Sequence, residues 1–377
     1  MSRLPETRVL TDWPAFEAVA DDWAALHARV GGALYSSHHW LAAMQAAFGL
    51  PGAMAFVTLW QGGRMVAAAP MVARPERLSK LAPFYRPPVL RLMACKYSGF
   101  VEMLAETDAL RARLAEAVHD VAAGRVIALD PLKAGAATDQ ILTVLGECGR
   151  TVTQAPRFRS VTIPARRTSA EHLAGRKAGF RKGLRKAQRR LEASGGRFVE
   201  VRHLDPAMMA RIEAISARSW KSAAGTSLAA DPGNARFLAE SSTRLAPDAM
   251  ILSIDGVDRA FAASIRYGMT DYMIWTEFDE TVAELSPGRL VVWELICCVL
   301  DRRDDRAVQD LVRRTHFTGE MGDEGYALLA ARAMPRRGAA HLLAAAEARL
   351  RAIAGHRRVG RRKRVRRADV NMLEAEA

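Results

Sequence analysis

The chain has 377 residues, 50% of them hydrophobic, and carries a formal net charge of +14 at pH 7. A chain of this length can bury two modest cores, so two domains are expected. Its apolar runs fall well short of the roughly 18 residues of a membrane-spanning helix, and its first residues lack the apolar core of a signal peptide, so we expect a cytoplasmic protein. The four cysteines have no CxxC spacing, which predicts neither a disulfide framework nor a metal site.

Helical and alternating patterns follow one another along the first half of the chain. The predicted elements there are helices at 12–29 and 37–48, a hairpin of strands 53–60 and 64–73, a strand near 99–104, a helix at 108–122, a strand at 125–129, a helix at 138–147 and a strand at 160–163. The second half repeats this order. Its predicted elements are helices at 168–194 and 206–221, strands at 250–254, 260–267 and 271–277, a helix at 287–300, a strand at 307–312 and helices from about 325 onward.

The repeated order predicts an α+β fold of mixed α/β layers, with a mostly antiparallel sheet flanked by helices in each half. We expect domains at residues 1–165 and 166–354, followed by a basic tail at 355–377. Within the tail, residues 356–367 hold eight basic side chains and no acid, too dense a run of one charge for a packed core. The chain lacks a dinucleotide fingerprint, a Walker loop, a hydrolase elbow and a zinc-protease motif, which excludes the commonest enzymes of those classes.

Basic residues also concentrate at 161–200, with 11 basic against 3 acidic side chains. In the predicted helix, Phe180, Leu184, Ala187 and Leu191 share one face. The other positions hold Arg181, Lys182, Arg185, Lys186, Arg189 and Arg190. Such a run is often only a solvated face. Like charges four residues apart repel one another, however, so an anionic ligand near them would stabilise the helix.

A short loop before the apolar helix at 287–300 is the main candidate for ligand binding. It reads Ser286-Pro287-Gly288-Arg289-Leu290. Pro287 suits a first helical turn, Gly288 permits a ligand to approach the backbone, and Arg289 adds positive charge beside free N–H groups. The loop therefore predicts an anion site, although a plain helix start with Ser286 as N-cap fits the same residues.

The first half differs at the corresponding junction. Residues 105–108 read Ala-Glu-Thr-Asp, with two acidic side chains and no glycine. Because acidic charge repels an anion, we expect a donor site in the second half and none in the first.

Several ordered motifs of the second half resemble the CelD-like acetyltransferases, which are GNAT-type proteins associated with cellulose and exopolysaccharide gene products. The resemblance is best over about 170–330 and rests on the basic run 181–192 (RKGLRKAQRRLE), on Ser219-Trp220-Lys221 with Gly225-Thr226-Ser227 behind it, on Phe278-Asp279-Glu280 followed by Leu285-Ser286-Pro287-Gly288, and on Gly322-Asp323-Glu324-Gly325-Tyr326. The last motif of the family reads Gly-Asp-Glu-Pro-Tyr-Lys, from which this chain departs at Gly325 and Ala327.

This resemblance implies tandem GNAT folds, as in the peptidoglycan aminoacyl transferases of the FemABX type. It also implies an acyl-CoA co-substrate, acetyl-CoA before longer acyl-CoAs, and no metal. The pyrophosphate of the donor would rest on the loop that opens the central helix, with the thioester along the preceding strand. The residues expected to hold it are Ser286, Gly288, Arg289 and Leu290.

Acyl transfer to an amine needs a base for the acceptor and an acid for the departing thiolate. Glu277 and Asp279 stand at the end of the strand beside the expected thioester, and either becomes a suitable base if burial raises its pKa. The candidate acid is Tyr326. Both carboxylates also fit a role as plain turn residues. The residues expected to line the acceptor pocket are Trp220, Lys221, Tyr272 and Asp323.

Three classes of function follow. The leading one is an acyl-CoA-dependent N- or O-acyltransferase that acts on a sugar, a glycan precursor or an amino compound. The second is a FemABX-like transferase using aminoacyl-tRNA, in which the basic helix contacts tRNA phosphates; nucleic acid is the less favoured partner. The third is a non-catalytic GNAT-like module that binds an anionic glycan or a protein. The absence of the family's lysine, replaced by Ala327, and of the tryptophan that follows it favours this interpretation.

Overall fold

The computed structural model of the chain describes residues 4–49, 52–79, 82–302, 308–311, 315, 317–339, 342–343 and 346. The predicted basic tail at 355–377 lies outside these residues, as do the ends of the strand predicted at 307–312.

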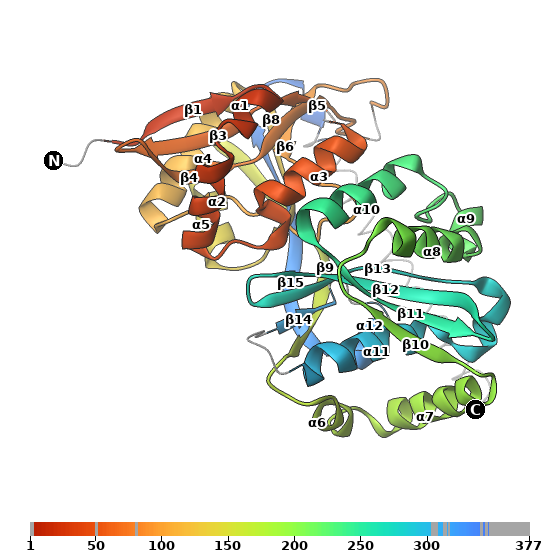
Figure 1. Cartoon of the computed structure of the whole chain (residues 1–377). Coiled ribbons are helices and arrows are strands. Elements are labelled where there is room, and N and C mark those ends of the chain that lie inside the picture. Colours follow the sequence, from red (N-terminus) through yellow and green to blue (C-terminus); the bar gives the residue numbers. More distant parts are fainter. Residues whose placement is uncertain are drawn as a thin grey trace, which may run out of the picture.

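The first half has a strand and a group of helices, then a run of consecutive strands, and only then alternating helices and strands (Figure 1). Its elements are β1 (Glu6–Leu10), α1 (Trp13–Glu17), α2 (Ala20–Val30), η1 (Leu34–Ser36), α3 (His38–Phe48), β2 (Ala53–Met54), β3 (Phe56–Gln61), β4 (Arg64–Ala69), β5 (Met71–Pro75), β6 (Pro88–Leu92), β7 (Leu104–Ala105), α4 (Asp108–Ala122), β8 (Val126–Lys133), α5 (Ala136–Glu147) and β9 (Arg150–Pro164).

The second half begins with two helices below the sheet in the view of Figure 1. Its elements are α6 (Ser169–Ala174), α7 (Ala178–Ala193), β10 (Arg197–Val201), α8 (Pro206–Ala217), α9 (Trp220–Ala223), α10 (Pro232–Leu245), β11 (Asp248–Ile254), β12 (Val257–Tyr267), β13 (Thr270–Phe278), η2 (Glu280–Leu285), α11 (Pro287–Asp301), β14 (Val308–Asp310), α12 (Thr318–Met321) and β15 (Asp323–Pro335).

The strands form two sheets, and most neighbouring strands are antiparallel. One sheet has the order β1-β3-β4-β7, and the other has the order β10-β11-β12-β13-β14-β9-β15-β8-β6-β5-β2. The exceptions to antiparallel pairing are β13 with β14 and β6 with β8, which are parallel. The predicted α+β fold with antiparallel-rich sheets flanked by helices is therefore confirmed.

The last strand, β15, corrects one prediction. Helices were expected from about 325 onward, but Asp323–Pro335 is a strand that pairs with β9 along one edge and with β8 along the other. Its middle is rich in Ala and Leu, which favour helices. Pairing along both edges, with Ala331 and Ala333 buried in the core, outweighs that local preference. The long strands β9 and β15 thus lie within the eleven-stranded sheet between β10–β14 of the second half and β8, β6, β5 and β2 of the first.

Three predicted helices are interrupted, and one of them, expected at 206–221, is broken between α8 and α9. The helix expected at 12–29 is broken between α1 and α2, and that expected at 168–194 is broken between α6 and α7. Thr168 starts α6 with a capping box: its side chain accepts from the Glu171 backbone, and the Glu171 side chain accepts from the Thr168 backbone. The helices at 37–48, 108–122, 138–147 and 287–300 agree with α3, α4, α5 and α11 within two residues.

The two halves share a buried core. Trp40 of α3 meets Phe237 of α10 edge to face, with ring centroids 5.1 Å apart, and Tyr35 meets Tyr272 of β13 at 5.3 Å. All four rings belong to one cluster of buried residues. Helix α11 and the apolar face of α7 cover the opposite side of the second sheet, where Leu184 and Leu290 pack in a separate cluster.

Candidate functional site

The junction between β13 and α11 is built without the expected side-chain cap. Ser286 has a left-handed backbone conformation, with φ 59° and ψ 45°, and its side chain makes no capping hydrogen bond. Its carbonyl instead accepts hydrogen bonds from the N–H groups of Arg289 (3.1 Å) and Leu290 (3.2 Å). Two of the amides that the sequence assigned to an anion are thus already engaged. Ser286 does occupy the N-cap position of α11, with Pro287 in the first turn, but its side chain does not cap the helix.

Protein groups also occupy the space expected for a ligand beside Gly288 and Arg289. A Cβ atom on Gly288 would lie 2.9 Å from the ring of Phe278, so the glycine makes room for that ring. The Arg289 guanidinium lies 5.4 Å from the centroid of the Phe180 ring and forms an ion pair with Glu320. An anion that binds at this loop must therefore compete with Glu320 for Arg289.

A cavity of about 350 Å³ lies next to this loop. Its walls come from the segments before and within α7, from α12 and from the start of β15, and include Arg176, Phe180, Glu320 and Asp323. Asp323 accepts a hydrogen bond from Arg176 (2.6 Å) and lies 3.7 Å from Arg167, and these partners lower its pKa. Asp323 therefore contacts the basic residues Arg167 and Arg176. Lys221, which was expected to line the same acceptor pocket, contacts β13 instead.

Gly325, one of the departures from the CelD-like motif, has a packing reason. A Cβ atom there would lie 2.2 Å from Ser160 Oγ and 2.8 Å from the Thr162 side chain on the neighbouring strand β9. The proline of the family would meet the same obstruction. The departure therefore belongs to the contact between β15 and β9.

Glu277 is the buried carboxylate of the site. Its side chain is 5% exposed at the end of β13. Oε2 accepts a hydrogen bond from Ser216 Oγ (2.7 Å), and Oε1 accepts one from the Leu228 backbone N–H (3.1 Å). Burial raises the pKa of Glu277 even though these bonds and the charge of Lys221 lower it. A carboxylate with a raised pKa is better suited to accept a proton than an ordinary surface carboxylate.

Asp279, the other candidate base, is held differently. It is fully buried and accepts hydrogen bonds from Arg218 (2.6 Å) and Arg259 (2.8 Å). Burial alone would raise its pKa, but the bonds from Thr281, Arg259 and Arg218 together lower it to about 2. Because a carboxylate with that pKa releases its proton readily and regains it poorly, the geometry favours Glu277 over Asp279 as a base.

Lys221 lies beside Glu277, and Trp220 is at the surface. Lys221 Nζ donates to the carbonyl of Thr276 on β13 (2.8 Å), and burial lowers the pKa of this lysine while the charge of Glu277 raises it. The Trp220 side chain is 48% exposed. The structure thus brings Lys221 next to the end of β13 and leaves the adjacent indole open to solvent.

The tyrosines of the predicted site lie in the core between the halves. The Tyr326 hydroxyl donates to Asp310 Oδ2 (2.5 Å). Burial and the Asp310 charge raise the pKa of Tyr326 and of Tyr272. A phenol whose proton is bound to a carboxylate and whose pKa is raised is a weak acid, so this geometry argues against Tyr326 as the proton donor.

Two residues of the first half reach the site and were missed by the sequence reasoning. Lys96 forms an ion pair with Asp231 (3.1 Å), and its positive charge lowers the pKa of Glu277. Tyr97 stacks on Phe237 with the ring planes 4° apart, and the Glu277 charge contributes to its raised pKa. Lys96 and Tyr97 lie between β6 and β7 and have no periodic pattern, so only the fold reveals their position.

Among the residues that the structure describes, no cluster of three or more His, Cys, Asp or Glu side chains could hold a metal ion. No helix in that part of the chain is both long and apolar enough to cross a membrane.

Known proteins share this architecture. Residues 178–328 match the family model of the acetyltransferase (GNAT) domain. FemX has a similar structure, with a TM-score of 0.56 at 10% identity over 86% of this chain and 96% of that one. L-PGS from Bacillus licheniformis has a TM-score of 0.51 at 9% identity, over 86% and 94% of the two chains.

A tandem GNAT protein from the clavulanic acid biosynthesis pathway is also similar, with a TM-score of 0.50 at 12% identity over 89% of this chain and all of that one. No curated protein is significantly similar to the chain in sequence. At these identities the solved structures show the shared fold alone. Residues 178–328 are thus similar to the GNAT acetyltransferase domain, within a fold that resembles tandem GNAT proteins.

Proposed function

We propose that the chain is an acyl-CoA-dependent acyltransferase in which Glu277 is the base and the acceptor is a sugar, a glycan precursor or an amino compound, as in the CelD-like proteins. The observation that carries this proposal is the buried Glu277 carboxylate at the end of β13, held by Ser216 and Leu228 and raised in pKa. The GNAT domain match over the same residues supports it.

Acyl-CoA would supply the acyl group and a thiolate leaving group. Glu277 would take a proton from the acceptor nitrogen or oxygen as that atom attacks the thioester carbonyl. The carbon–sulfur bond then breaks, and the thiolate needs a proton. Lys221 is the donor that the geometry favours, because its Nζ, reaching from α9, contacts the Thr276 carbonyl at the same strand end and burial lowers its pKa toward that of a thiol. The proton on Glu277 then returns to Lys221 through solvent.

The donor would lie along β13, with its phosphates near the start of α11. Arg289 is the cation there, and it would have to exchange Glu320 for a phosphate. Arg176 and Lys177 line the adjacent cavity and would add positive charge. The domain boundaries near residue 165 and the absence of a donor site in the first half are part of this proposal.

The acceptor would approach from the side on which Trp220, Lys96 and Asp231 are exposed. The side chains of Lys96 and Asp231 are 47% and 41% exposed, and the exposed Trp220 offers a flat apolar surface. A polar ring or chain that carries an amino or hydroxyl group fits such a mixed surface. Lys96 and Asp231 would then bind the acceptor without taking part in the chemistry.

The test is release of free thiol from acetyl-CoA in the presence of amino sugars, neutral sugars and amino acids. Replacement of a general base typically lowers the rate by about 10²–10⁴-fold, and we expect Glu277→Gln to fall in this range. Glu280→Gln, which changes an exposed carboxylate nearby, should retain the wild-type rate. In the wild type the rate should rise with pH through a pKa above the ordinary glutamate value. Equal rates for Glu277→Gln and Glu280→Gln would refute the role of Glu277.

A second candidate is an aminoacyl-tRNA-dependent transfer, as in the FemABX type, and the exposed side of α7 favours it. Lys182, Arg185, Lys186 and Arg189 are exposed there, and no carboxylate among the described residues forms an ion pair with them. Arg181 donates to the carbonyls of Ala174 and Arg176 instead. A row of unpaired cations fits a polyanion such as the tRNA backbone.

This second candidate predicts tRNA binding that weakens steeply with salt. Each phosphate contact removed should reduce the slope of log K against log salt by about 0.7–0.9. The triple variant Lys182→Gln, Lys186→Gln, Arg189→Gln should therefore bind more weakly and with a flatter salt dependence. Arg113→Gln, an exposed change on α4, is the matched control. Binding that is absent or independent of salt would leave acyl-CoA as the donor.

A further inference from the structure

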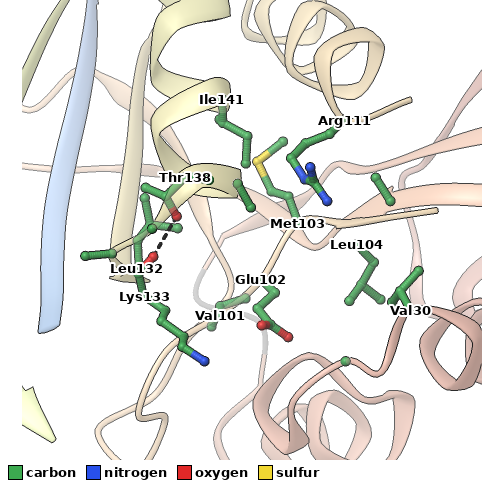
Figure 2. A pocket seen from close by; sticks show the side chains of 16 residues that line it. Val30, Val101, Glu102, Met103, Leu104, Arg111, Leu132, Lys133, Thr138 and Ile141 are labelled. Atoms are coloured by element: carbon green, nitrogen blue, oxygen red, sulfur yellow. Dashed lines mark hydrogen bonds between the residues drawn. The ribbon is translucent and has the colours of Figure 1, made fainter. Parts of the chain in front are cut away.

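The first half contains a cavity of about 280 Å³ where its strands separate into two sheets. Strand β7 belongs to the four-stranded sheet and β8 to the eleven-stranded one, and the cavity opens between the segments 101–105 and 132–138. Figure 2 shows Arg111 on one side of the lining, Lys133 and Glu102 on another, and apolar side chains such as Leu104 and Ile141 around them. Its volume is near the lower end of the ~300–1,000 Å³ that is usual for small-molecule sites.

The acidic residues expected to repel anions here are already neutralised. Glu106 accepts hydrogen bonds from Arg29 (2.6 Å) and Arg64 (2.8 Å). Asp108 forms an ion pair with Arg111 and is largely exposed. The electrostatic argument from residues 105–108 therefore does not apply to the cavity, whose charged lining is Arg111, Lys133 and Glu102.

Lys133 carries a positive charge that no described carboxylate neutralises in an ion pair. Its ammonium group lies 5.6 Å from the centroid of the Phe100 ring and 4.9 Å from that of Tyr326. These aromatic faces hold the cation in place without supplying an anion. Lys133 is exposed, so water solvates its charge, and the ammonium stays free of an ion pair at the edge of the cavity, where an anionic ligand can reach it.

Glu102 supplies the opposite charge on the same lining. Its Oε2 accepts a hydrogen bond from the Ala33 N–H (2.7 Å), and no described residue donates to Oε1. Burial raises the pKa of Glu102 and the charge of Lys133 lowers it, yet the two side chains form no ion pair with each other. A positive and a negative group are therefore held apart on one cavity.

The start of α5 adds hydrogen-bond donors to this lining. Gly135, its N-cap residue, has no side chain to cap the helix, and residues 134–138 all line the cavity. The first amides of a helix attract negative groups. An anion in the cavity would thus meet both the Lys133 ammonium and these amides.

We propose that this cavity binds a small zwitterion of the apolar amino-acid class. Its carboxylate would contact Lys133 and the first amides of α5, its ammonium would contact Glu102 Oε1, and its apolar side chain would pack on Leu104 and Ile141. A ligand with separated positive and negative groups satisfies both charges of the lining at once, which a simple anion or cation does not. This site is independent of the acyl-transfer proposal.

Calorimetric titration of the full chain with leucine, valine, methionine and phenylalanine tests the proposal. Isocaproate, which is leucine without its amine, and isoamylamine, which lacks the carboxylate, serve as matched probes. We expect at least one amino acid to bind, and both analogues of leucine to bind at least ten-fold more weakly than leucine itself. No heat with any of the four amino acids at millimolar concentration would overturn the proposal, and so would an analogue that binds as tightly as leucine.

Variants separate the two contacts. Lys133→Gln should weaken leucine binding at least ten-fold, whereas Glu102→Gln should weaken leucine and leave isocaproate unchanged. Arg113→Gln on the exposed side of α4 should bind leucine as the wild type does. If a variant does not fold, amide NMR of the wild type decides the matter: leucine should shift the signals of residues 136–138, and shifts confined to other regions would refute the site.

Discussion

The two strand-to-helix junctions of the chain have opposite charge in sequence and opposite surroundings in the structure. At 105–108 the acidic Glu106 is neutralised by Arg29 and Arg64, and an accessible cavity with the unpaired Lys133 lies next to it. At 286–290 the basic Arg289 is neutralised by Glu320, and the Phe278 ring lies against Gly288. The charge of a loop therefore does not determine what it binds. The residues that pair with the charged side chains of the loop determine how much of that charge is left to act on a ligand.

The largest expected effect is a difference in unfolding free energy between variants of two carboxylates: the buried Asp279 near the second junction and the partly exposed Glu106 at the first. Asp279→Asn leaves Arg218 and Arg259 without their buried counter-charge, which costs about 3 kcal/mol of unfolding free energy. The Glu106 side chain is 18% exposed whereas that of Asp279 is 0% exposed, so Glu106→Gln should cost less than about 1 kcal/mol. Urea unfolding at pH 7 measures both, and equal losses would contradict the comparison.

The loss of stability caused by Asp279→Asn has a pH dependence with a defined sign. Because the folded pKa of Asp279 is about 2, below its usual value of 3.8, its stabilising contribution is fully present above pH 4 and is lost as pH falls toward 2. The difference in stability between wild type and Asp279→Asn should therefore shrink over that range. A difference that stays constant from pH 7 to pH 2 would show that the charge of Asp279 is not its source.

A medium effect tests why the second junction carries a glycine. Gly288→Ala forces a Cβ atom against the Phe278 ring and should cost about 1–2 kcal/mol of unfolding free energy. The double variant Gly288→Ala, Phe278→Leu should recover part of that loss. Gly179→Ala in the first turn of α7 is the control: open space surrounds it, and the change should be neutral or slightly stabilising. A stabilising Gly288→Ala would mean that the ring does not occupy this space.

The smallest expected effect on stability concerns the residues at the N-termini of α4 and α11. Thr107 caps α4 by accepting a hydrogen bond from the Leu110 N–H (3.2 Å), whereas the Ser286 side chain does not cap α11. Thr107→Ala should therefore cost about 1 kcal/mol, and Ser286→Ala only a few tenths. Thermal unfolding of the two variants resolves this difference. A larger loss for Ser286→Ala would restore the capping role that the sequence suggested.

Much of the helical framework was predictable because local signals and tertiary packing agree there. In α4 and α11 the periodic apolar residues, Thr107 as a cap and Pro287 in the first turn all indicate the observed boundaries. The strand β15 was not predictable, because its Ala- and Leu-rich sequence favours a helix and only its pairing with β8 and β9 makes it a strand. Strand β10 and helix α10 were not predicted, although Asp231 and Pro232 mark the start of α10 and its buried residues recur at helical spacing.

For the site, the sequence located Glu277 and Lys221 but not what surrounds them. Ser216 precedes Glu277 by 61 positions, and Lys96 comes from the other half of the chain, so neither contact leaves a local pattern. The predicted Tyr326 and Asp323 have partners, Asp310 and Arg176, that only the fold brings to them. Sequence patterns identify a residue's chemistry, whereas its protonation and accessibility depend on distant neighbours.

The most direct test of a donor site in the second half is calorimetric titration of acetyl-CoA into the wild type and two variants. Glu320→Gln removes the competitor for Arg289 and should tighten binding by about 2- to 5-fold, the size of a surface ion pair. Glu106→Gln makes the same change of charge at the first junction and should leave the affinity unchanged. If acetyl-CoA does not bind the wild type, or if Glu106→Gln tightens binding as much as Glu320→Gln, then the start of α11 is not the donor site.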